Sequence, residues 1–400
     1  MKETYLECVI TPCYLYDGLE FKKSVDGFRQ VLLSLLNSAT IGYSVKTNSI
    51  PYLLKRAKEE DCLAEVVSYD EYELANLCGF SPERIIYNGP MKSKESFLEA
   101  VIGGGIVNIE TKRELKWLKS LPAEGQYKVG LRLNINISRV SPEDADGAGD
   151  NSRFGFSDET EEFKDAVAFI SSLPNVSLSG LHIHRTAHSR SPRFYRNSVA
   201  YAASVIRKYN LNLEYLDVGG GYFGIFPNKP TFEDYAAAIE DGIGEFKNLR
   251  IIVEPGNALV ASCFSFLTEV IDLKRVDEKT VFVTTDGSRN DVDPFFHKTD
   301  YLKKIYRKDN DRDVIPTQII TGCSCLEYDR LFTLRNEKEL KVGDRILYNN
   351  VGAYTLTLSP LFIRYFPAVY AIEKSGKFKL VRKPWNASYL IRNDKELWNE

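Results

Sequence analysis

The stretch Ile41-Gly-Tyr-Ser-Val-Lys-Thr-Asn-Ser-Ile50 guides the interpretation of the whole chain. Up to Val45 it is apolar enough for a buried strand, and Pro51 then favours the start of a helix. Lys46 closes this predicted strand, although a buried ammonium group must be desolvated or paired. Lys46 is therefore either a side chain that reaches solvent at the strand end or an amine held for Schiff-base chemistry.

The composition is that of a globular protein without a strong charge bias. Hydrophobic residues make up 44% of the 400 residues and charged residues 27%, with a formal net charge of −3. Nucleic-acid and anionic-membrane binding both favour a basic surface, which this balance does not indicate. No apolar run approaches a membrane span, and the seven cysteines show no disulfide pattern. We therefore expect a cytoplasmic protein that binds neither nucleic acid nor membrane.

Strand-like and helix-like segments alternate over the first two thirds of the chain. The strand-like segments are 41–46, 62–68, 85–88, 106–109, 128–134, 178–184, 215–218 and 250–253. This alternation predicts a parallel α/β domain, and the strand count favours a (β/α)8 TIM-like barrel. A doubly wound sheet is the alternative, because alternation alone does not show that the sheet closes.

After residue 260 the pattern changes to short β-like segments with few helices between them. This change predicts a second, mostly antiparallel domain, either a β-barrel or a sandwich. Nothing in the sequence ties the first residues to the barrel, so we assign them to the second domain. The expected barrel covers 16–262, and the expected β domain covers 1–15 plus 263–400.

Polar residues and glycines stand at the ends of the predicted barrel strands more often than stability alone explains. Barrels of this type carry their chemistry at the carboxyl ends of the strands. The residues at these ends are Lys46, Ser68, Asn88, Arg132, Asn134, His182, His184, Asp217, Gly219 to Gly221 and Glu254. We therefore expect the functional site among them.

His182 and His184 are two residues apart on one predicted strand, so their side chains should face the same way. Such a pair can bind zinc, and a metal-dependent hydrolase is one alternative function. Against it, the pair stands on a late strand, and no acidic ligand at barrel-strand spacing is evident. We expect no metal, and we expect His182 to be a hydrogen-bonded core residue.

Leu216-Asp-Val-Gly-Gly-Gly221 leads a strand into three glycines, whose backbone N–H groups can approach a phosphate closely. Glu254 ends another apolar strand, where a structural salt bridge is the simpler explanation in isolation. Together with Lys46 and His184, these residues have one common interpretation. A lysine forms a Schiff base, glycines hold a phosphate, an imidazole covers a ring, and a carboxylate meets a ring nitrogen. This combination is typical of a pyridoxal 5'-phosphate site.

The chain resembles the fold-type III pyridoxal-phosphate decarboxylases, which include diaminopimelate and ornithine decarboxylases. The resemblance covers nearly the whole chain. It is carried by Thr11-Pro-Cys-Tyr-Leu-Tyr-Asp17, Tyr43-Ser-Val-Lys-Thr-Asn48, Glu65-Val-Val-Ser68 with Glu71, Tyr87-Asn-Gly-Pro90, Ser152-Arg-Phe-Gly155, Gly180-Leu-His-Ile-His184, Asp217-Val-Gly-Gly-Gly221, Glu254-Pro-Gly256, Cys325 with Asp329, and Gly352-Ala-Tyr-Thr355.

By this resemblance Lys46 would carry the cofactor, and His184 would stack on its ring. Glu254 would keep the pyridine nitrogen protonated, so that the ring accepts electrons when CO2 leaves the external aldimine. Alanine racemases place an arginine at that point, so Glu254 implies decarboxylation rather than racemisation. The residues implied around the phosphate are Gly219, Gly220, Gly221, Gly256, Asn257 and Tyr354.

Cys325 matches the family cysteine that reprotonates the carbanion from the neighbouring subunit. The resemblance therefore implies a homodimer with its active sites at the subunit interface. The catalytic residues implied are Lys46, His184 and Cys325. The residues expected to contact the small-molecule amino-acid substrate are Arg132, Arg185, Glu327 and Tyr354.

The chain departs from the family pattern at several positions. The family usually has a Gly-Ser pair where Thr186 and Ala187 stand, and an arginine where Asn257 stands. How the phosphate is held is therefore open. The family's acidic residue after the cysteine binds the distal amino group of the substrate, and this chain has Leu326 there. Glu327 follows, but on an extended segment it would face the opposite way.

Four arginines crowd the segment after the histidines, namely Arg185, Arg190, Arg193 and Arg196. A solvated helix start is the simpler explanation, since surface arginines are common. The alternative is a patch that binds an anion, because guanidinium groups suit carboxylates.

We expect a pyridoxal-phosphate-dependent amino-acid decarboxylase whose substrate has a modified, acylated or anionic distal end. Siderophore and antibiotic biosynthesis use such substrates, in contrast to free ornithine or lysine. One alternative is diaminopimelate decarboxylase proper. Another is a catalytically silent relative that regulates by binding, although such a protein would not need Lys46, His184, Glu254 and Cys325 together.

Overall fold

The protein divides into two compact units. The computed structural model describes residues 6–145, 152–185, 187–373 and 375–392. One unit spans 22–259, and the other joins 1–21 to 260–400. Strand β1 (Cys13–Asp17) runs past the expected boundary at residue 16 and belongs to the sheet of the second unit. Within the described ranges, no helix combines the length and apolar character needed to cross a membrane.

Eight parallel strands of the larger unit close into a barrel, with neighbours in the order β2-β3-β4-β5-β6-β8-β9-β10 and β10 paired with β2. Their bounds are Ala39–Ser44 (β2), Leu63–Ser68 (β3), Ile85–Met91 (β4), Ile106–Ile109 (β5), Tyr127–Asn134 (β6), Val176–His182 (β8), Tyr215–Asp217 (β9) and Arg250–Val253 (β10). The short β7 (Phe156–Ser157) extends β6 at one edge. Closure confirms the predicted barrel over the doubly wound sheet.

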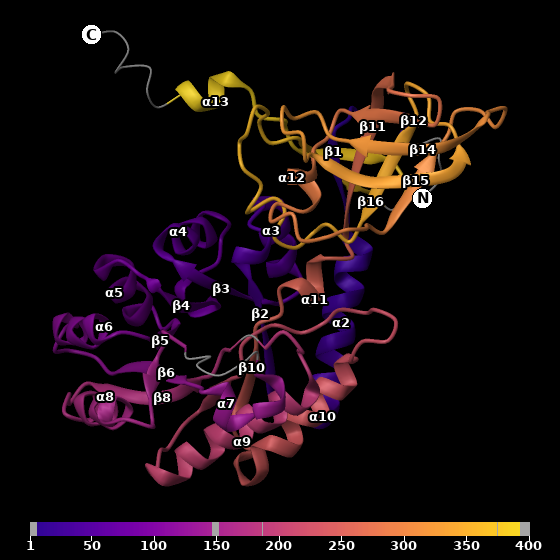
Figure 1. The fold of residues 1–400 in the computed structure, drawn as a ribbon. Coiled ribbons are helices and arrows are strands. Elements are labelled where there is room, and N and C mark those ends of the chain that lie inside the picture. Colours follow the sequence, from indigo (N-terminus) through magenta and orange to yellow (C-terminus); the bar gives the residue numbers. More distant parts are fainter. Residues whose placement is uncertain (1–5, 146–151, 186, 374, 393–400) are drawn as a thin grey trace. The chain divides into compact units, whose positions relative to one another are not determined.

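Helices follow the barrel strands and lie outside them in Figure 1. They are α2 (Gly18–Leu35), α3 (Pro51–Glu59), α4 (Tyr69–Leu77), α5 (Lys94–Ile102), α6 (Lys112–Trp117), α7 (Ile137–Val140), α8 (Glu161–Ser171), α9 (Pro192–Lys208), α10 (Phe232–Ile243) and α11 (Asn257–Val260). Side chains of Ser68, Ser93 and Thr111 accept backbone N–H groups at the starts of α4, α5 and α6. Such N-caps end the preceding connection and fix where each helix begins.

The first barrel strand ends earlier than the sequence predicts. β2 stops at Ser44, and Val45–Thr47 form a short 3-10 turn closed by a bond from Asn48 N to Val45 O of 3.1 Å. Lys46 therefore stands on a turn at the carboxyl end of the barrel instead of within the strand.

The second unit is a mostly antiparallel sheet. Its strands are β1, β11 (Phe264–Arg275), β12 (Thr280–Thr285), β13 (Lys303–Tyr306), β14 (Val314–Thr321), β15 (Arg330–Lys338), β16 (Arg345–Asn349), β17 (Ala368–Ile372) and β18 (Phe378–Arg382), with α12 (Arg289–Val292) and α13 (Ala387–Ile391) as short helices. The parallel pairs are β1 with β17 and β12 with β14. Strand β1 lies between β11 and β17, which places residues 13–17 inside this sheet.

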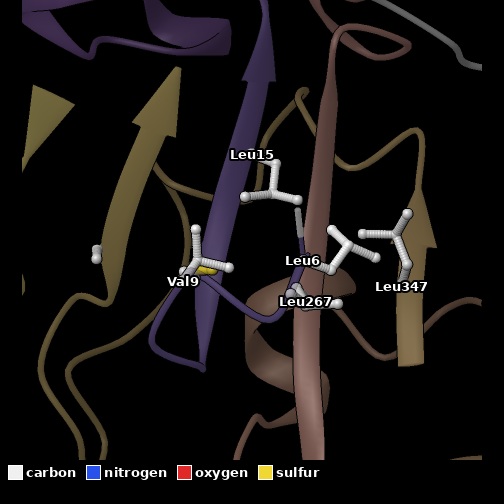
Figure 2. Packing of buried hydrophobic residues seen from close by; sticks show 7 residues of the cluster. Leu6, Val9, Leu15, Leu267 and Leu347 are labelled. Carbon is white, nitrogen blue, oxygen red and sulfur yellow. The ribbon is translucent and has the colours of Figure 1, made fainter. Parts of the chain in front are cut away.

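A buried apolar cluster joins the N-terminal segment to this sheet (Figure 2). Leu6, Val9 and Leu15 meet Leu267 of β11 and Leu347 of β16. Burying each leucine contributes about 1.5–3 kcal/mol, so the cluster anchors the N-terminus. Residues 6–9 form a turn here.

Candidate active site

Lys46 presents an accessible amine bound to a buried carboxylate. Its side chain is 31% exposed, whereas that of Glu65 on β3 is 1% exposed. Lys46 Nζ lies 2.9 Å from Glu65 Oε2 and 3.3 Å from Oε1. Ser44 Oγ donates a further hydrogen bond of 2.6 Å to Glu65 Oε2. The carboxylate thus fixes the amine at the carboxyl end of the barrel, where the lysine side chain stays partly exposed.

Asn88, at the carboxyl half of β4, connects Glu65 to Glu254. Its Nδ2 donates to Glu65 Oε1 at 3.1 Å and also to Glu254 Oε1. Its Oδ1 accepts from Asn108 Nδ2 at 2.8 Å. The carboxylates of Glu65 and Glu254 therefore accept hydrogen bonds from the same amide group inside the barrel.

Glu254 also lies beside His182 and Asp217, which end the neighbouring strands β8 and β9. One donor or acceptor atom from each of the three residues lies within 4.8 Å of the others, and all three side chains are buried. The sequence did not reveal these acidic neighbours of His182. Burial, followed by the charge of Glu254, raises the pKa of Asp217 well above its usual range.

His182 differs from the hydrogen-bonded residue that the sequence predicts. Neither ring nitrogen makes a hydrogen bond to the described part of the chain, and Nε2 is 3.7 Å from Glu254 Oε2. Burial, with the nearby charge of Arg132, holds the pKa of His182 well below its usual range. The ring is therefore neutral.

His184 follows β8 and faces the same way as His182, as the sequence predicts. The two rings are 6.2 Å apart and 18° from parallel. Gly220 N donates to His184 Nδ1 at 3.1 Å, so the ring proton is on Nε2. Burial lowers the pKa of His184 well below its usual range, and the charge of Arg132 lowers it further. His184 thus offers a neutral ring face at the barrel mouth.

The glycines after β9 form a close-packed loop between His184 and Glu254. Gly219 has φ +70°, and a Cβ there would lie 2.4 Å from His184 Nδ1. A Cβ on Gly220 would lie 2.3 Å from the carbonyl oxygen of Glu254. Both positions therefore require glycine. An amine, a flat imidazole, a buried carboxylate and a glycine loop consequently share one end of the barrel.

The family model described as pyridoxal-dependent decarboxylase, pyridoxal binding domain, matches residues 22–261. The chain belongs to this family. The match covers the whole barrel together with its strand ends. The chain is therefore an enzyme of the pyridoxal-phosphate-dependent decarboxylases, as the sequence predicts.

Relatives of known name match along almost the whole chain. Diaminopimelate decarboxylase of Aquifex aeolicus is 27% identical over 95% of this chain and 91% of its own length. The L-glutamyl acyl-carrier-protein decarboxylase of Niallia circulans is also 27% identical, over 95% of this chain and 93% of its own. The structure of Helicobacter pylori diaminopimelate decarboxylase with L-lysine has a TM-score of 0.83 at 24% identity, covering 98% of this chain and 99% of that one. The last similarity establishes the fold.

The barrel mouth of this decarboxylase fits pyridoxal phosphate. The amine of Lys46 suits the cofactor's aldehyde, and the neutral ring of His184 suits the face of the pyridine ring. The buried carboxylate of Glu254 suits the pyridine nitrogen. Two N–H groups of the glycine loop already donate hydrogen bonds within the protein. Gly219 N donates to Asp217 Oδ1 at 3.0 Å, and Gly220 N donates to His184 Nδ1. The contact of Gly221 N–H with the phosphate stays a prediction. Thr186, at the departure from the family pattern, lies outside the described residues.

The segment Glu254 to Asn257 lies against the turn that carries Lys46. A Cβ on Gly256 would be 2.0 Å from Thr47 Oγ1, so glycine permits the two segments to touch. Asn257 begins the short α11 and is half-buried. Gly256 and Asn257 therefore border the site, and their contact with phosphate stays a prediction.

Arg132 on β6 holds the backbone next to the site. Its Nη1 donates to Glu110 Oε1 at 2.7 Å, and its Nη2 donates to the carbonyl of His184 at 2.8 Å. The side chain is buried. These bonds give Arg132 a structural role in positioning His184, and its contact with substrate stays a prediction.

The arginines after the histidines do not form a continuous anion-binding patch. Arg193 Nε bonds Asp144 Oδ2 at 3.1 Å, and Arg196 pairs with Asp241. The guanidinium group of Arg190 lies 5.0 Å from the ring centre of Phe223. These partners are distant in sequence, so the sequence alone did not reveal them. Arg185, half-buried directly after His184, remains the candidate for substrate contact.

Asp144 ties the loop after β6 to the segment before α9. Its carboxylate accepts from Ser189 Oγ and Ser191 Oγ at 2.6 and 2.7 Å, in addition to Arg193. Burial alone would raise the pKa of Asp144, but these hydrogen bonds outweigh it and hold the pKa at about 2. Residues 189–193 are thereby tied to the loop after β6.

Cys325, Glu327 and Tyr354 belong to the second unit and are all exposed. The predicted extended conformation around Glu327 is wrong, because 322–329 form the loop between β14 and β15. Asp329 is buried in this loop and accepts from Arg289 N at 2.8 Å and Ser324 N at 3.1 Å. Asp329 therefore organises the loop that carries Cys325.

A second lysine–glutamate pair, between the end of β4 and α6, is fully buried. Lys92 follows β4 and bonds Glu114 Oε2 at 3.2 Å, with both side chains 0% exposed. Lys92 Nζ also donates to the carbonyl of Gly89 at 2.6 Å. Neither Lys92 nor Glu65 was given a role from the sequence, because each pairing depends on residues about twenty positions away.

Proposed function

We propose that this pyridoxal-phosphate-dependent decarboxylase acts on an α-amino acid whose distal end is acylated, carrier-bound or anionic. The observation that carries the proposal is Leu326, directly after Cys325. The family binds a distal ammonium group with an acidic residue at that position. A leucine there provides no charge for an amine, so a free diamino acid fits poorly.

The remaining acids of this loop do not replace the missing charge. Asp329 is buried, and its carboxylate is occupied by Ser288 Oγ, Arg289 N and Ser324 N. Glu327 is exposed, so water competes for any ion pair that it forms. A distal group that needs no carboxylate partner is consistent with both observations.

Two relatives of this chain represent two substrate classes. The Niallia circulans relative is named for a glutamyl group on an acyl carrier protein, which agrees with our proposal. The Aquifex aeolicus relative is named for diaminopimelate. Diaminopimelate is therefore the second candidate substrate, at the same level of sequence identity. Biosynthesis of a siderophore or antibiotic is the setting that we infer for the first class.

The roles that we propose for the barrel residues follow from their geometry. Lys46 Nζ would hold the cofactor, and Glu65 keeps this amine in place. Bound pyridoxal phosphate supplies an electron sink for the bond to CO2. Glu254 would hold the proton of the pyridine nitrogen, and the neutral His184 would cover the ring without adding charge. The amide of Gly221 and the side chain of Asn257 would contact the phosphate.

We also propose a homodimer in which Cys325 of one protomer serves the barrel of the other. The Cys325 side chain is exposed, as such an arrangement requires. Its Sγ would return a proton to the α-carbon after CO2 leaves. Tyr354 of the same unit is 40% exposed and is assigned to phosphate and substrate contact. The cysteine pattern agrees with a cytoplasmic location.

Membership of the decarboxylase family argues against a metal-dependent hydrolase and against a catalytically silent regulator. The hydrolase hypothesis rested on His182 and His184, and both histidines line the barrel mouth that fits pyridoxal phosphate. A silent regulator has no need for Lys46 and Glu254 at one barrel mouth. We therefore retain neither hypothesis.

Release of CO2 from a panel of amino acids tests the substrate proposal. The panel contains free diaminopimelate, ornithine and lysine, each distally acylated counterpart, and a glutamyl thioester of a carrier protein. We expect kcat/KM to be at least about tenfold higher for an acylated or carrier-bound substrate, which corresponds to ~1.4 kcal/mol. A preference for free diaminopimelate would overturn the proposal in favour of the second candidate.

A pair of variants at Leu326 sharpens this test. Leu326→Glu should raise the activity on free diamino acids, because it adds a carboxylate for the distal amine. Leu326→Gln, of the same size without the charge, is the matched control. Equal changes in activity on free diamino acids for both variants would show that the residue at position 326 does not interact with the charge at the distal end of the substrate.

A further inference from the structure

Asn88 is the central member of a hydrogen-bond chain across the barrel interior. Tyr215 Oη on β9 donates to Asn108 Oδ1 at 2.9 Å, and Asn108 Nδ2 donates to Asn88 Oδ1 at 2.8 Å. Both asparagines are buried. The orientation of the Asn88 amide follows, because its oxygen faces a donor and its nitrogen faces two carboxylates.

The two N–H groups of this amide are divided between Glu65 and Glu254. The nitrogen is 3.1 Å from Glu65 Oε1 and in direct contact with Glu254 Oε1. Glu65 is the partner of Lys46, and Glu254 is the carboxylate proposed for the pyridine nitrogen. One neutral side chain thus bridges the groups assigned to opposite ends of the cofactor ring system.

Asparagine is well suited to this position. A buried carboxylate needs donors, and a bond to a charged group is worth more than a neutral one. Lysine would supply donors but would add a charge that competes with the pyridine nitrogen for Glu254. Serine would supply one donor, and aspartate would place a third acid between two others. The amide satisfies both carboxylates and leaves the net charge of the site unchanged.

We propose that Asn88 is a positioning residue that aims Glu254 at the ring nitrogen of the cofactor and fixes its distance from Glu65. The proposal rests on the assignment of Lys46 and Glu254 to the cofactor, and it is independent of the substrate. Loss of Asn88 leaves Glu254 buried without this donor, beside Asp217. The carboxylate is then less well placed, and less stable as an anion, where the pyridine nitrogen would meet it.

Cofactor binding to the enzyme freed of cofactor tests this role in the absence of substrate. The dissociation constant is measured for pyridoxal phosphate and for its 1-deaza analogue, in which a carbon replaces the ring nitrogen. Asn88→Ala should weaken binding of pyridoxal phosphate about 10- to 100-fold. For the analogue the loss should be at least about fivefold smaller, because Glu254 has no nitrogen to meet. Equal losses for both compounds, or no loss for either, would overturn the proposal.

Two further variants separate positioning from folding. Asn88→Ser keeps one donor and should give an intermediate loss, and it replaces the alanine variant if that protein does not fold. Asn197→Ala is the matched control, because this amide on α9, outside the candidate site, donates to Ser141 Oγ at 3.1 Å. It should change the melting temperature without changing the ratio of the two dissociation constants.

Glu254→Gln serves as the reference for complete loss of recognition. It should remove most of the wild-type preference for pyridoxal phosphate over the analogue. A wild-type enzyme that binds both compounds equally would overturn the assignment of Glu254 and with it the role of Asn88. Because no substrate is present, this result leaves the proposed substrate class unaffected.

Discussion

Lys46 and Lys92 are two lysines at the ends of barrel strands, each paired with a buried glutamate, and yet they are suited to different tasks. The Lys46 side chain is 31% exposed, and its carboxylate partner is 1% exposed. Lys92 and Glu114 are both fully buried. Lys92 has a second acceptor in the Gly89 carbonyl and lies 5.4 Å from the centre of the Tyr87 ring.

The difference shows that access to the amine, rather than burial of its partner, separates a reactive lysine from a structural one. Lys92 is enclosed on every side and cannot meet a ligand. Lys46 is fixed by Glu65 on one side and faces the barrel mouth on the other, with His184 and the glycine loop nearby. We therefore expect substitutions at the two pairs to affect different properties of the enzyme, most strongly at Lys46.

Replacing Lys46 by alanine should abolish decarboxylation, with kcat/KM lowered by at least about 10⁴-fold. The amine is then absent, and borohydride reduction should no longer fix cofactor to the peptide that contains position 46. Mass spectrometry of the reduced, digested protein measures this. The melting temperature should fall less than in the Lys92 variant, because Ser44 Oγ and Asn88 Nδ2 still donate to the buried Glu65. Cofactor fixed to Lys92 in this variant would contradict the division between the two lysines.

Replacing Lys92 by methionine should have the opposite profile. Breaking a buried ion pair leaves Glu114 uncompensated, and the free energy of unfolding should fall by about 3–5 kcal/mol. Denaturant unfolding measures this loss. The fraction of cofactor fixed to Lys46 after reduction should equal that of the wild type. A variant that keeps its stability and loses the cofactor would refute a structural role for Lys92.

Exchanging each glutamate for glutamine compares the two pairs directly. Glu65→Gln should weaken cofactor binding about 10- to 100-fold, because a charge-assisted bond to Lys46 is lost. Glu114→Gln should instead reduce stability, since Lys92 stays buried. Measuring the cofactor dissociation constant and the melting temperature of both variants separates the effects. The same profile for both variants would show that the pairs are equivalent.

The smallest expected effect concerns Glu71, which lies near Lys46 and Glu65. Burial raises its pKa to about 7 from the ordinary 4.5, against the hydrogen bond from Val67 N. The folded protein therefore holds this proton more tightly than the unfolded chain. Ionised Glu71 lowers the stability of the folded state, and this cost grows between about pH 4.5 and pH 7.

Glu71→Gln should thus raise the melting temperature of the cofactor-free enzyme more at pH 8 than at pH 5, by a few degrees. Thermal unfolding at the two pH values measures the difference. Glu73→Gln, on the exposed side of the same helix, is the matched control and should give equal shifts at both. A pH-independent gain from Glu71→Gln would contradict this prediction.

The sequence was informative about the barrel because parallel strands are buried on both faces and form apolar runs. All eight predicted strands are present, and their closure follows from the pairing of β5 with β6. The ends of the strands were less predictable. Lys46 lies beyond β2 because the hydrogen bond from Asn48 N to Val45 O turns the chain there. No residue pattern in the sequence predicts this turn.

The site residues were found where each one stands at a strand end. Lys46, His184, Glu254 and the glycine loop share one barrel mouth, as predicted. Asn88 was also found at a strand end, but Glu65 and the hydrogen bonds of Asn88 to Glu65 and Glu254 were not predicted, because these residues become neighbours only when separate strands align. The sequence left the four arginines between a solvated helix start and an anion-binding patch for the same reason, since Asp144 and Asp241, which pair with two of them, are distant in sequence. Long-range pairing was the missing information in each case.

Because β1 lies between β11 and β17, it can pair fully only after both later strands have been synthesised. At roughly 5–20 residues per second, the ribosome needs about 20–70 s after making β1 before it completes β17. The barrel strands emerge during this interval and can pair without β1. The first strand is thus synthesised early and paired late. Until β11 is made, neither partner strand of β1 exists, and until β17 is made one edge of β1 stays unpaired, which is when it can pair wrongly with another chain.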